Sequence, residues 1–60
     1  MLRKFVGDKK SAEARSDDGR IWVIELFDRG QVQKFVDATE AELNQLMRER
    51  GLRPAPATRA

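Results

Sequence analysis

The chain has 60 residues, 12 basic and 10 acidic side chains, and neither cysteine nor histidine. A chain of this length forms one small domain that buries only about 60% of the surface its unfolded form exposes, so we expect marginal stability. The composition excludes disulfides, cysteine nucleophiles and the zinc sites built from cysteine and histidine. The net charge of +2 is small and the two signs alternate along most of the sequence, unlike the continuous basic surface of a dedicated nucleic-acid binder.

Neither a secretory signal nor a membrane span is visible in the sequence. No apolar run follows Arg3 and Lys4, and the longest such run, Ile21 to Ile24, is too short to cross a bilayer. The absence of cysteine is compatible with a reducing compartment. We therefore expect a soluble, cytoplasmic protein that binds no membrane.

The N-terminal third predicts one strand, one ambiguous segment and a turn. Leu2 to Val6 alternates along the chain, so a strand would place Leu2, Lys4 and Val6 on one side and Arg3 and Phe5 on the other. Ser11 to Arg15 fits an edge strand, although its alanines and glutamate fit a helical turn equally well. Ser16-Asp17-Asp18-Gly19 predicts a turn, because aspartate accepts hydrogen bonds from local amides and glycine adopts positive φ.

A β-hairpin between Gly19 and Val36 is the clearest element of the sequence. Asp28-Arg29-Gly30 fits a three-residue connection with glycine in a G1 bulge. That connection pairs Phe27 with Gln31, and the resulting partners are Leu26 with Val32, Ile24 with Lys34, Trp22 with Val36, Glu25 with Gln33, and Val23 with Phe35. The central strand is then apolar on both faces, with one set formed by Trp22, Ile24, Leu26, Val32 and Val36 and a second by Ile21, Val23, Phe27 and Phe35.

A helix is predicted from Thr39 to Arg50. Thr39 and Glu42 have the spacing of a capping box. Gly51 suits the left-handed residue of a Schellman motif, in which Leu52 folds back on the helix. The apolar stripe of this helix consists of Leu43, Leu46 and Met47. Residues 53–60 alternate proline with alanine, which predicts a flexible, extended tail outside a domain of residues 1–52.

These elements indicate the α+β class: a small antiparallel β-sheet of two secure strands, with three or four in total expected, packed on one C-terminal α-helix. The helical stripe would cover one sheet face, and the core is expected to form around Trp22, Ile24 and Leu26.

Catalytic and cofactor chemistry is not expected. The commonest general base and the thiol nucleophile are absent, and Ser11 and Ser16 lie in polar segments with no evident activating partner. Asp17 and Asp18, together with Asp8 or Glu13, lack the spacing of a calcium loop. The Asp-Asp-Gly turn explains these aspartates without a metal.

One helix covers one sheet face, so the second apolar face of the hairpin needs an explanation. It is either a solvated face on which Glu25 and Gln33 maintain solubility, a face covered by Phe5 and Val6 of the N-terminal segment, or a docking surface. As a docking surface for a protein partner or a second copy, it would comprise Ile21, Val23, Glu25, Phe27, Gln33 and Phe35.

A basic surface is the alternative site. A sheet backed by a helix can insert a β-ribbon into the major groove of DNA, and single-stranded RNA would stack on exposed aromatic residues. The candidate contacts to nucleic acid are Arg3, Lys4, Lys9, Lys10, Arg20, Arg29 and Lys34. Interleaved acidic residues favour an ordinary solubilising role for these side chains.

The hypothesis that follows is a small, non-catalytic regulatory or interaction module of prokaryotic or phage type. It would bind a larger protein, or a second copy in a homodimer, through the outer face of its hairpin. Binding of DNA or RNA by the basic hairpin and flanks is the alternative. Pairing of an open strand edge with another chain is a third interpretation.

Overall fold

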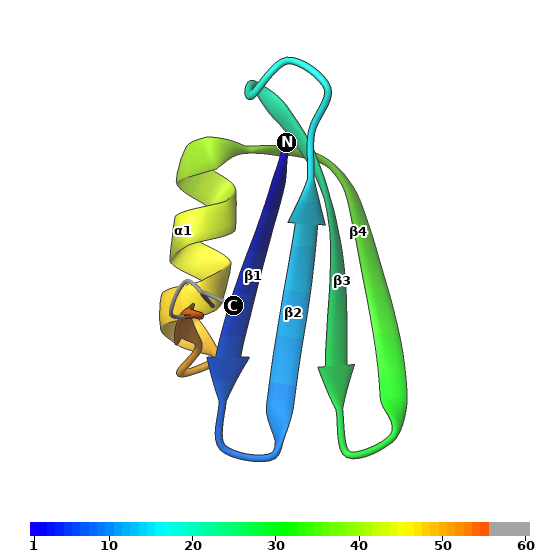
Figure 1. The fold of residues 1–60 in the computed structure, drawn as a ribbon, viewed down its shortest axis with the longest axis vertical. Coiled ribbons are helices and arrows are strands. Elements are labelled where there is room, and N and C mark those ends of the chain that lie inside the picture. Colours follow the sequence, from blue (N-terminus) through cyan, green and yellow to red (C-terminus); the bar gives the residue numbers. More distant parts are fainter. Residues whose placement is uncertain (56–60) are drawn as a thin grey trace, which may run out of the picture.

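The computed structural model describes residues 1–55 and shows an antiparallel sheet of five strands with a helix against one face (Figure 1). The elements are β1 (Leu2–Gly7), β2 (Lys10–Arg15), β3 (Ile21–Asp28), β4 (Gln31–Thr39), α1 (Glu40–Glu49) and β5 (Arg53–Pro54). The strand order is β4-β3-β2-β1-β5. The predicted α+β class is confirmed, and the sheet has more strands than expected.

The segment predicted as an edge strand or a helical turn is a strand, β2, but it is an internal one between β1 and β3, so the edge position and the helical alternative are wrong. Ala12 and Ala14 are 1% and 0% exposed. Ala12 lies between Phe5 of β1 and Leu26 of β3 in the sheet. Two small side chains in the middle strand leave room for the large ones beside them, and this tertiary packing overrides the helical preference of alanine.

The β3–β4 hairpin has a shorter turn than predicted. Asp28 pairs with Gln31, and the two turn residues, Arg29 and Gly30, have φ of 51° and 82°. Positive φ at both positions is the geometry of a type I′ turn, which matches the twist of the flanking strands. Arginine seldom takes the first of these positions, and for that reason the sequence favoured a three-residue connection.

The shorter turn moves the pairing of the hairpin by one residue. Leu26 lies opposite Gln33, Ile24 opposite Phe35 and Phe27 opposite Val32, so all the predicted pairs are wrong. A one-residue shift exchanges the two faces of a strand. Phe35 therefore packs against the core.

A bulge near the end of β4 changes the register again. The pairing shifts between Trp22 and Ile24, where Asp37 has a φ of 58°. Ala38 consequently lies opposite Trp22, in the place predicted for Val36. Val36 itself is 60% exposed.

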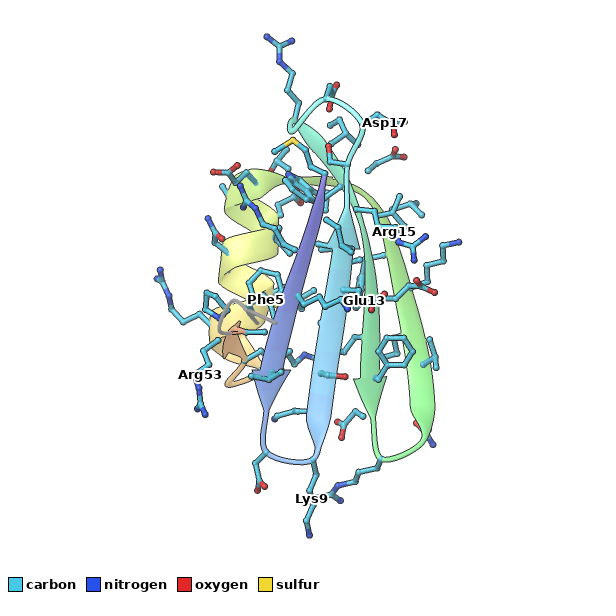
Figure 2. All side chains as sticks on the ribbon, in the orientation of Figure 1. Phe5, Lys9, Glu13, Arg15, Asp17 and Arg53 are labelled. Carbon is cyan, nitrogen blue, oxygen red and sulfur yellow. The ribbon has the colours of Figure 1, made fainter. Side chains whose placement is uncertain are left out.

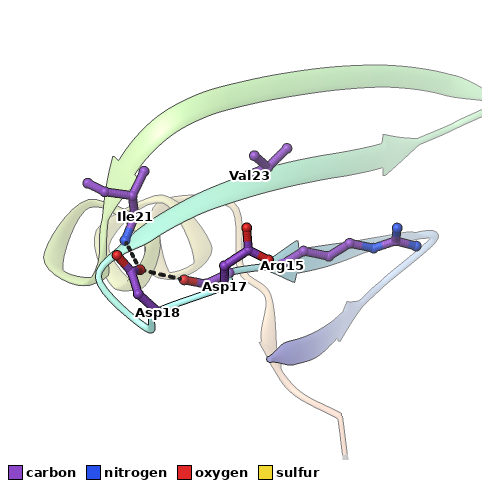
Figure 3. A pocket seen from close by; sticks show the side chains of 6 residues that line it. Arg15, Asp17, Asp18, Ile21 and Val23 are labelled. Carbon is purple, nitrogen blue, oxygen red and sulfur yellow. Dashed lines mark hydrogen bonds between the residues drawn. The ribbon is translucent and has the colours of Figure 1, made fainter.

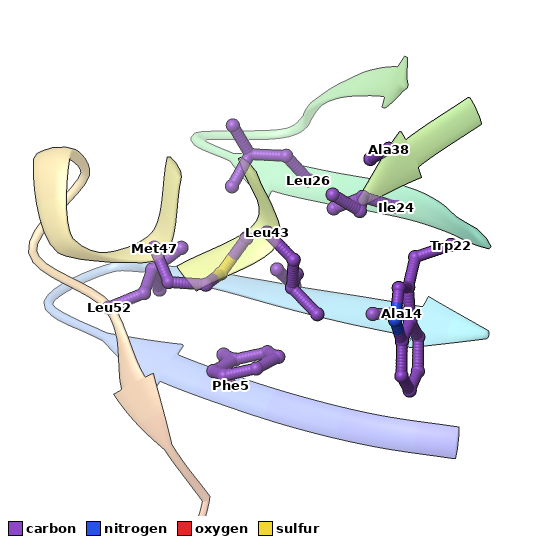
Figure 4. Packing of buried hydrophobic residues seen from close by; sticks show 10 residues of the cluster. Phe5, Ala14, Trp22, Ile24, Leu26, Ala38, Leu43, Met47 and Leu52 are labelled. Atoms are coloured by element: carbon purple, nitrogen blue, oxygen red, sulfur yellow. The ribbon is translucent and has the colours of Figure 1, made fainter. Parts of the chain in front are cut away.

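The predicted core and both helix ends are confirmed (Figure 4). Thr39 Oγ1 accepts a hydrogen bond from the Glu42 amide, and Glu42 Oε1 accepts one from the Thr39 amide. At the other end the Leu52 amide donates to the Met47 carbonyl at 2.8 Å, which completes a Schellman motif. The core consists of Phe5, Ala12, Ala14, Trp22, Ile24, Leu26, Ala38, Leu43, Met47 and Leu52, with Phe35 and Leu46 partly buried against it.

The chain does not leave the domain at residue 53. Arg53 and Pro54 pair with Val6 and Phe5 as β5, and the Ala55 amide donates to the Lys4 carbonyl at 2.8 Å. The predicted free tail is therefore wrong for its first three residues, because the Schellman turn directs the chain back along the open edge of β1. The rest of that tail, residues 56–60, lies outside the described residues.

Candidate interaction face

The sheet has an outer face on the side opposite α1. Successive side chains of a strand point to opposite faces, and the side chains that alternate with the core belong to this surface. It is formed by Leu2, Lys4, Val6, Ser11, Glu13, Arg15, Ile21, Val23, Glu25, Phe27, Val32 and Lys34. No element within residues 1–55 covers it (Figures 1 and 2).

Cross-strand pairing arranges the outer face in rows across β1 to β4. The apolar row comprises Val6, Ser11, Phe27 and Val32, which are consecutive partners across the four strands. The charged row, two residues further along each strand, comprises Lys4, Glu13, Glu25 and Lys34. A third row contains Leu2, Arg15 and Val23. The face therefore has apolar groups on both sides of a central line of charges.

The charged row places two carboxylates next to each other. Glu13 and Glu25 are direct partners, an arrangement that destabilises a sheet when nothing compensates it. Lys4 is the other cross-strand neighbour of Glu13, and Lys34 is that of Glu25. Arg15 Nη2 also lies 3.8 Å from Glu13 Oε1. Basic groups thus balance the carboxylate pair.

A hollow of about 290 Å³ opens at one end of the outer face (Figure 3). Ile21 and Val23 form its apolar wall, and the remaining lining comes from Arg15 and the Ser16 to Asp18 segment. Asp18 Oδ1 accepts hydrogen bonds from the amides of Arg20 at 2.8 Å and Ile21 at 3.3 Å. These bonds stabilise the carboxylate and lower the pKa of Asp18 below its ordinary value.

The predicted turn at Ser16 to Gly19 is confirmed. Gly19 has a φ of 79°, and its amide donates to Ser16 Oγ at 2.7 Å. Asp18 thus stabilises the backbone of the loop by accepting hydrogen bonds from its amides. Among residues 1–55 no group of three or more carboxylates is placed to hold a metal ion.

The structure brings together four of the six residues predicted for a protein-binding face. Ile21, Val23, Glu25 and Phe27 share the outer face on β3, whereas Gln33 and Phe35 lie on the helix side because of the register shift. The sequence missed Val6, Ser11 and Val32 as members of the apolar row. Their strand alternation was a usable signal, but their neighbours depend on the strand order.

The expectation that Phe5 and Val6 cover the outer face is wrong. β1 extends the sheet beside β2 instead of crossing it. Phe5 is buried beneath α1 in the core, and Val6 belongs to the apolar row of the outer face itself.

The seven predicted nucleic-acid contacts do not form one stripe. Lys9 and Arg29 occupy the turns at one end of the sheet, while Arg20 lies in the loop at the other end (Figure 1). Arg3 lies on the helix side, with its guanidinium 4.6 Å from the centre of the Trp22 ring and Nη2 3.3 Å from Glu40 Oε1. Of the others, Lys4 and Lys34 lie at the two ends of the charged row, on β1 and β4, and Lys10 is the first residue of β2.

No protein-family model, curated protein or solved structure matches this chain significantly. The single helix of the described residues, α1, is not long and apolar enough to cross a membrane.

Proposed function

We propose that the chain is a small, non-catalytic regulatory module that binds a protein partner through the outer face of its sheet. The observation that supports this is the exposure of large apolar side chains opposite the helix. Leu2, Ile21 and Val32 are 53%, 45% and 57% exposed, with half-buried Val23 and Phe27 beside them. Exposed apolar groups on both sides of the charged row gain free energy when a partner excludes water from them, at about 25 cal/mol per Å².

The side-chain chemistry of the module supports binding without catalysis. Ser16 is buried, and its hydroxyl is engaged with Asp18 and the Gly19 amide. Ser11 lies between Val6 and Phe27 in the apolar row, and Glu13, the carboxylate that lines the same hollow as Ser11, is paired with Arg15. A function that uses surface complementarity fits these groups better than one that needs an activated nucleophile.

A protein partner fits the charge distribution better than nucleic acid does. Phosphate backbones require a row of unpaired basic groups. The outer face instead places acidic and basic residues beside each other between apolar ones, so it offers no continuous basic surface. The basic turn residues Lys9 and Arg29 would have to carry nucleic-acid binding, with the acidic Asp8 and Asp28 as their neighbours.

The experiment is a capture assay with tagged protein in a lysate of the source organism, with and without nuclease. The test variant is Phe27→Asp on the outer face, and the matched control is Asn44→Asp on exposed α1. A protein that the wild type and the control retain, but Phe27→Asp loses, supports the proposal once direct binding is shown with both proteins purified. Retention of nucleic acid, or of proteins only through nucleic acid, overturns it.

A further inference from the structure

The charges of the outer face are arranged antisymmetrically about the apolar row. On β3, Glu25 lies two residues before Phe27, and Arg29, in the turn that follows β3, lies two residues after it. Two residues along a strand span about 6.8 Å. Equal numbers of residues on either side of the row therefore lead to opposite charges, one in the strand and one in the turn.

The other strands repeat this arrangement. On β2, Glu13 and the turn residue Lys9 lie on opposite sides of Ser11. On β1, Lys4 and the turn residue Asp8 lie on opposite sides of Val6, with the signs reversed. Figure 2 shows Lys9 at the tip of the β1–β2 turn and Glu13 further along the sheet. The edge strand β4 has Lys34 on one side of Val32 and the neutral Gly30 on the other.

We infer that the partner of this face is a second copy of the chain, related by a two-fold axis that runs along the apolar row and across the strands. This inference deepens the proposed function and rests on it for the use of the outer face. The axis places Glu25 against Arg29 of the second copy, Glu13 against its Lys9 and Lys4 against its Asp8. Because the axis is a two-fold, each of these pairs occurs twice.

Charge also excludes the other simple face-to-face arrangement. A two-fold axis parallel to the strands, between β2 and β3, would place Glu13 against Glu25 and Lys4 against Lys34. Like charges held together at an interface are strongly unfavourable. In the antiparallel arrangement the charges of β1, β2 and β3 meet groups of opposite sign, and Lys34 of β4 meets the neutral Gly30.

The centre of this interface is apolar. Phe27, Val32 and Val6 each meet their own counterparts across the axis. Only the turn-side half of each sheet overlaps, so the interface is small and leaves Leu2, Ile21 and Val23 outside it. We expect a dissociation constant between about 10 µM and about 1 mM.

The conformation of the turns agrees with a role for their basic residues. Lys9 and Arg29 have φ of 58° and 51°, a region that side-chain-bearing residues seldom occupy. Glycine or asparagine would fit both turns with less strain. Long basic side chains at these two positions are what the antiparallel dimer uses, because they reach the carboxylates of the second copy.

The test is analytical ultracentrifugation over about 5 µM to about 1 mM, combined with a charge exchange. Glu25→Arg and Arg29→Glu alone should each weaken the dimer about tenfold, and the double variant should restore it, because the pair then meets with exchanged signs. Arg20→Glu is the matched control. Arg20 lies in the loop at the other end of the sheet, outside the half that overlaps, so reversal of its charge should change the dissociation constant little.

A second measurement requires no variant. Amide chemical shifts of the wild type, followed on dilution, should change around Ser11 and Phe27 and not around Ile21. A chain that stays monomeric throughout, or single variants that weaken a dimer without rescue in the double variant, overturns this arrangement. If the chain is monomeric and Phe27→Asp still abolishes capture of another protein, the proposed function stands and the second copy is the wrong partner.

Discussion

Arg29 has a left-handed backbone, with a φ of 51°. In that conformation the Cβ of an L-residue lies close to its own backbone, which costs about 1 kcal/mol or more. Asparagine tolerates the conformation better because its side chain hydrogen-bonds to the nearby backbone. Arg29→Asn should therefore raise the free energy of unfolding by about 0.5–1 kcal/mol. Urea denaturation at low micromolar concentration, where the chain is monomeric, measures this change.

Lys34→Asn is the control for that substitution. Lys34 lies in the extended strand β4, where asparagine is less favourable than in a turn. A gain in stability at residue 34 equal to that at residue 29 would show that removal of a positive charge, and not relief of backbone strain, is responsible.

Acid sensitivity follows from Asp18. The amides of Arg20 and Ile21 donate to its carboxylate and lower its pKa. A carboxylate with a lowered folded-state pKa contributes stability above its unfolded pKa and loses that contribution as pH falls through the folded value. The wild type should therefore lose stability on acidification below about pH 4.

Asp18→Asn isolates this contribution, because asparagine keeps an oxygen acceptor but has no charge. Unfolding midpoints in urea should fall less for Asp18→Asn than for the wild type between about pH 6 and about pH 3. Equal falls would contradict a role for Asp18. Glu42, whose pKa the Thr39 amide lowers, contributes to the fall in both proteins.

At the scale of elements, the end of β1 packs directly against the end of α1. A Cβ at Gly7 would lie 3.0 Å from Leu52 Cδ2 and 3.1 Å from the Gly51 carbonyl oxygen. Gly7→Ala should therefore force Leu52 out of its place in the core and destabilise the fold by about 1–3 kcal/mol.

Thermal unfolding of Gly7→Ala beside Ser11→Ala measures that effect. Ser11 is the strand partner of Val6 and lies on the outer face, away from the helix terminus. A stable Gly7→Ala protein would show that the Schellman turn can move relative to β1 without loss of packing.

The elements that the sequence predicted well are those determined by neighbouring residues. Thr39 with Glu42, and Gly51 with Leu52, act within a few positions of each other, so their spacing alone predicted the helix ends. Arg29 was misleading because its conformation is atypical for arginine, and the one-residue error in the turn displaced Phe35 to the wrong face. The burial of Ala12 and Ala14 is explained only by their neighbours on β1 and β3, because Phe5 and Leu26 flank Ala12, and Arg3 and Ile24 flank Ala14.

The outer face was predicted only along β3. Val23 and Phe27 lie on one strand, so alternation alone placed them together. Val6 and Ser11 come from two other strands, and their position beside Phe27 depends on the order β3-β2-β1. The Arg53–Pro54 strand had no periodic signal, because two residues are too few to show one.

At the scale of the whole molecule, the small size of the domain makes its stability sensitive to association with a partner. The sheet and helix fill only 29 × 28 × 18 Å, and a domain this small gains about 3–5 kcal/mol from its core. No disulfide supplements that core within residues 1–55. Any partner that binds only the folded form therefore adds appreciably to its stability.

The melting temperature should therefore depend on protein concentration. The proposed antiparallel dimer would form only from folded chains, so mass action would stabilise the folded state as concentration rises. Between about 10 µM and about 1 mM the wild type should gain a few degrees, because about 1 kcal/mol shifts the melting temperature of a 60–100-residue domain by about 4–8 °C. Scanning calorimetry at the two concentrations measures the shift. Glu25→Arg should show a smaller rise in melting temperature, and the double variant Glu25→Arg/Arg29→Glu should show the same rise as the wild type. A wild-type melting temperature that does not change with concentration would contradict the dimer and indicate that the domain folds as a monomer.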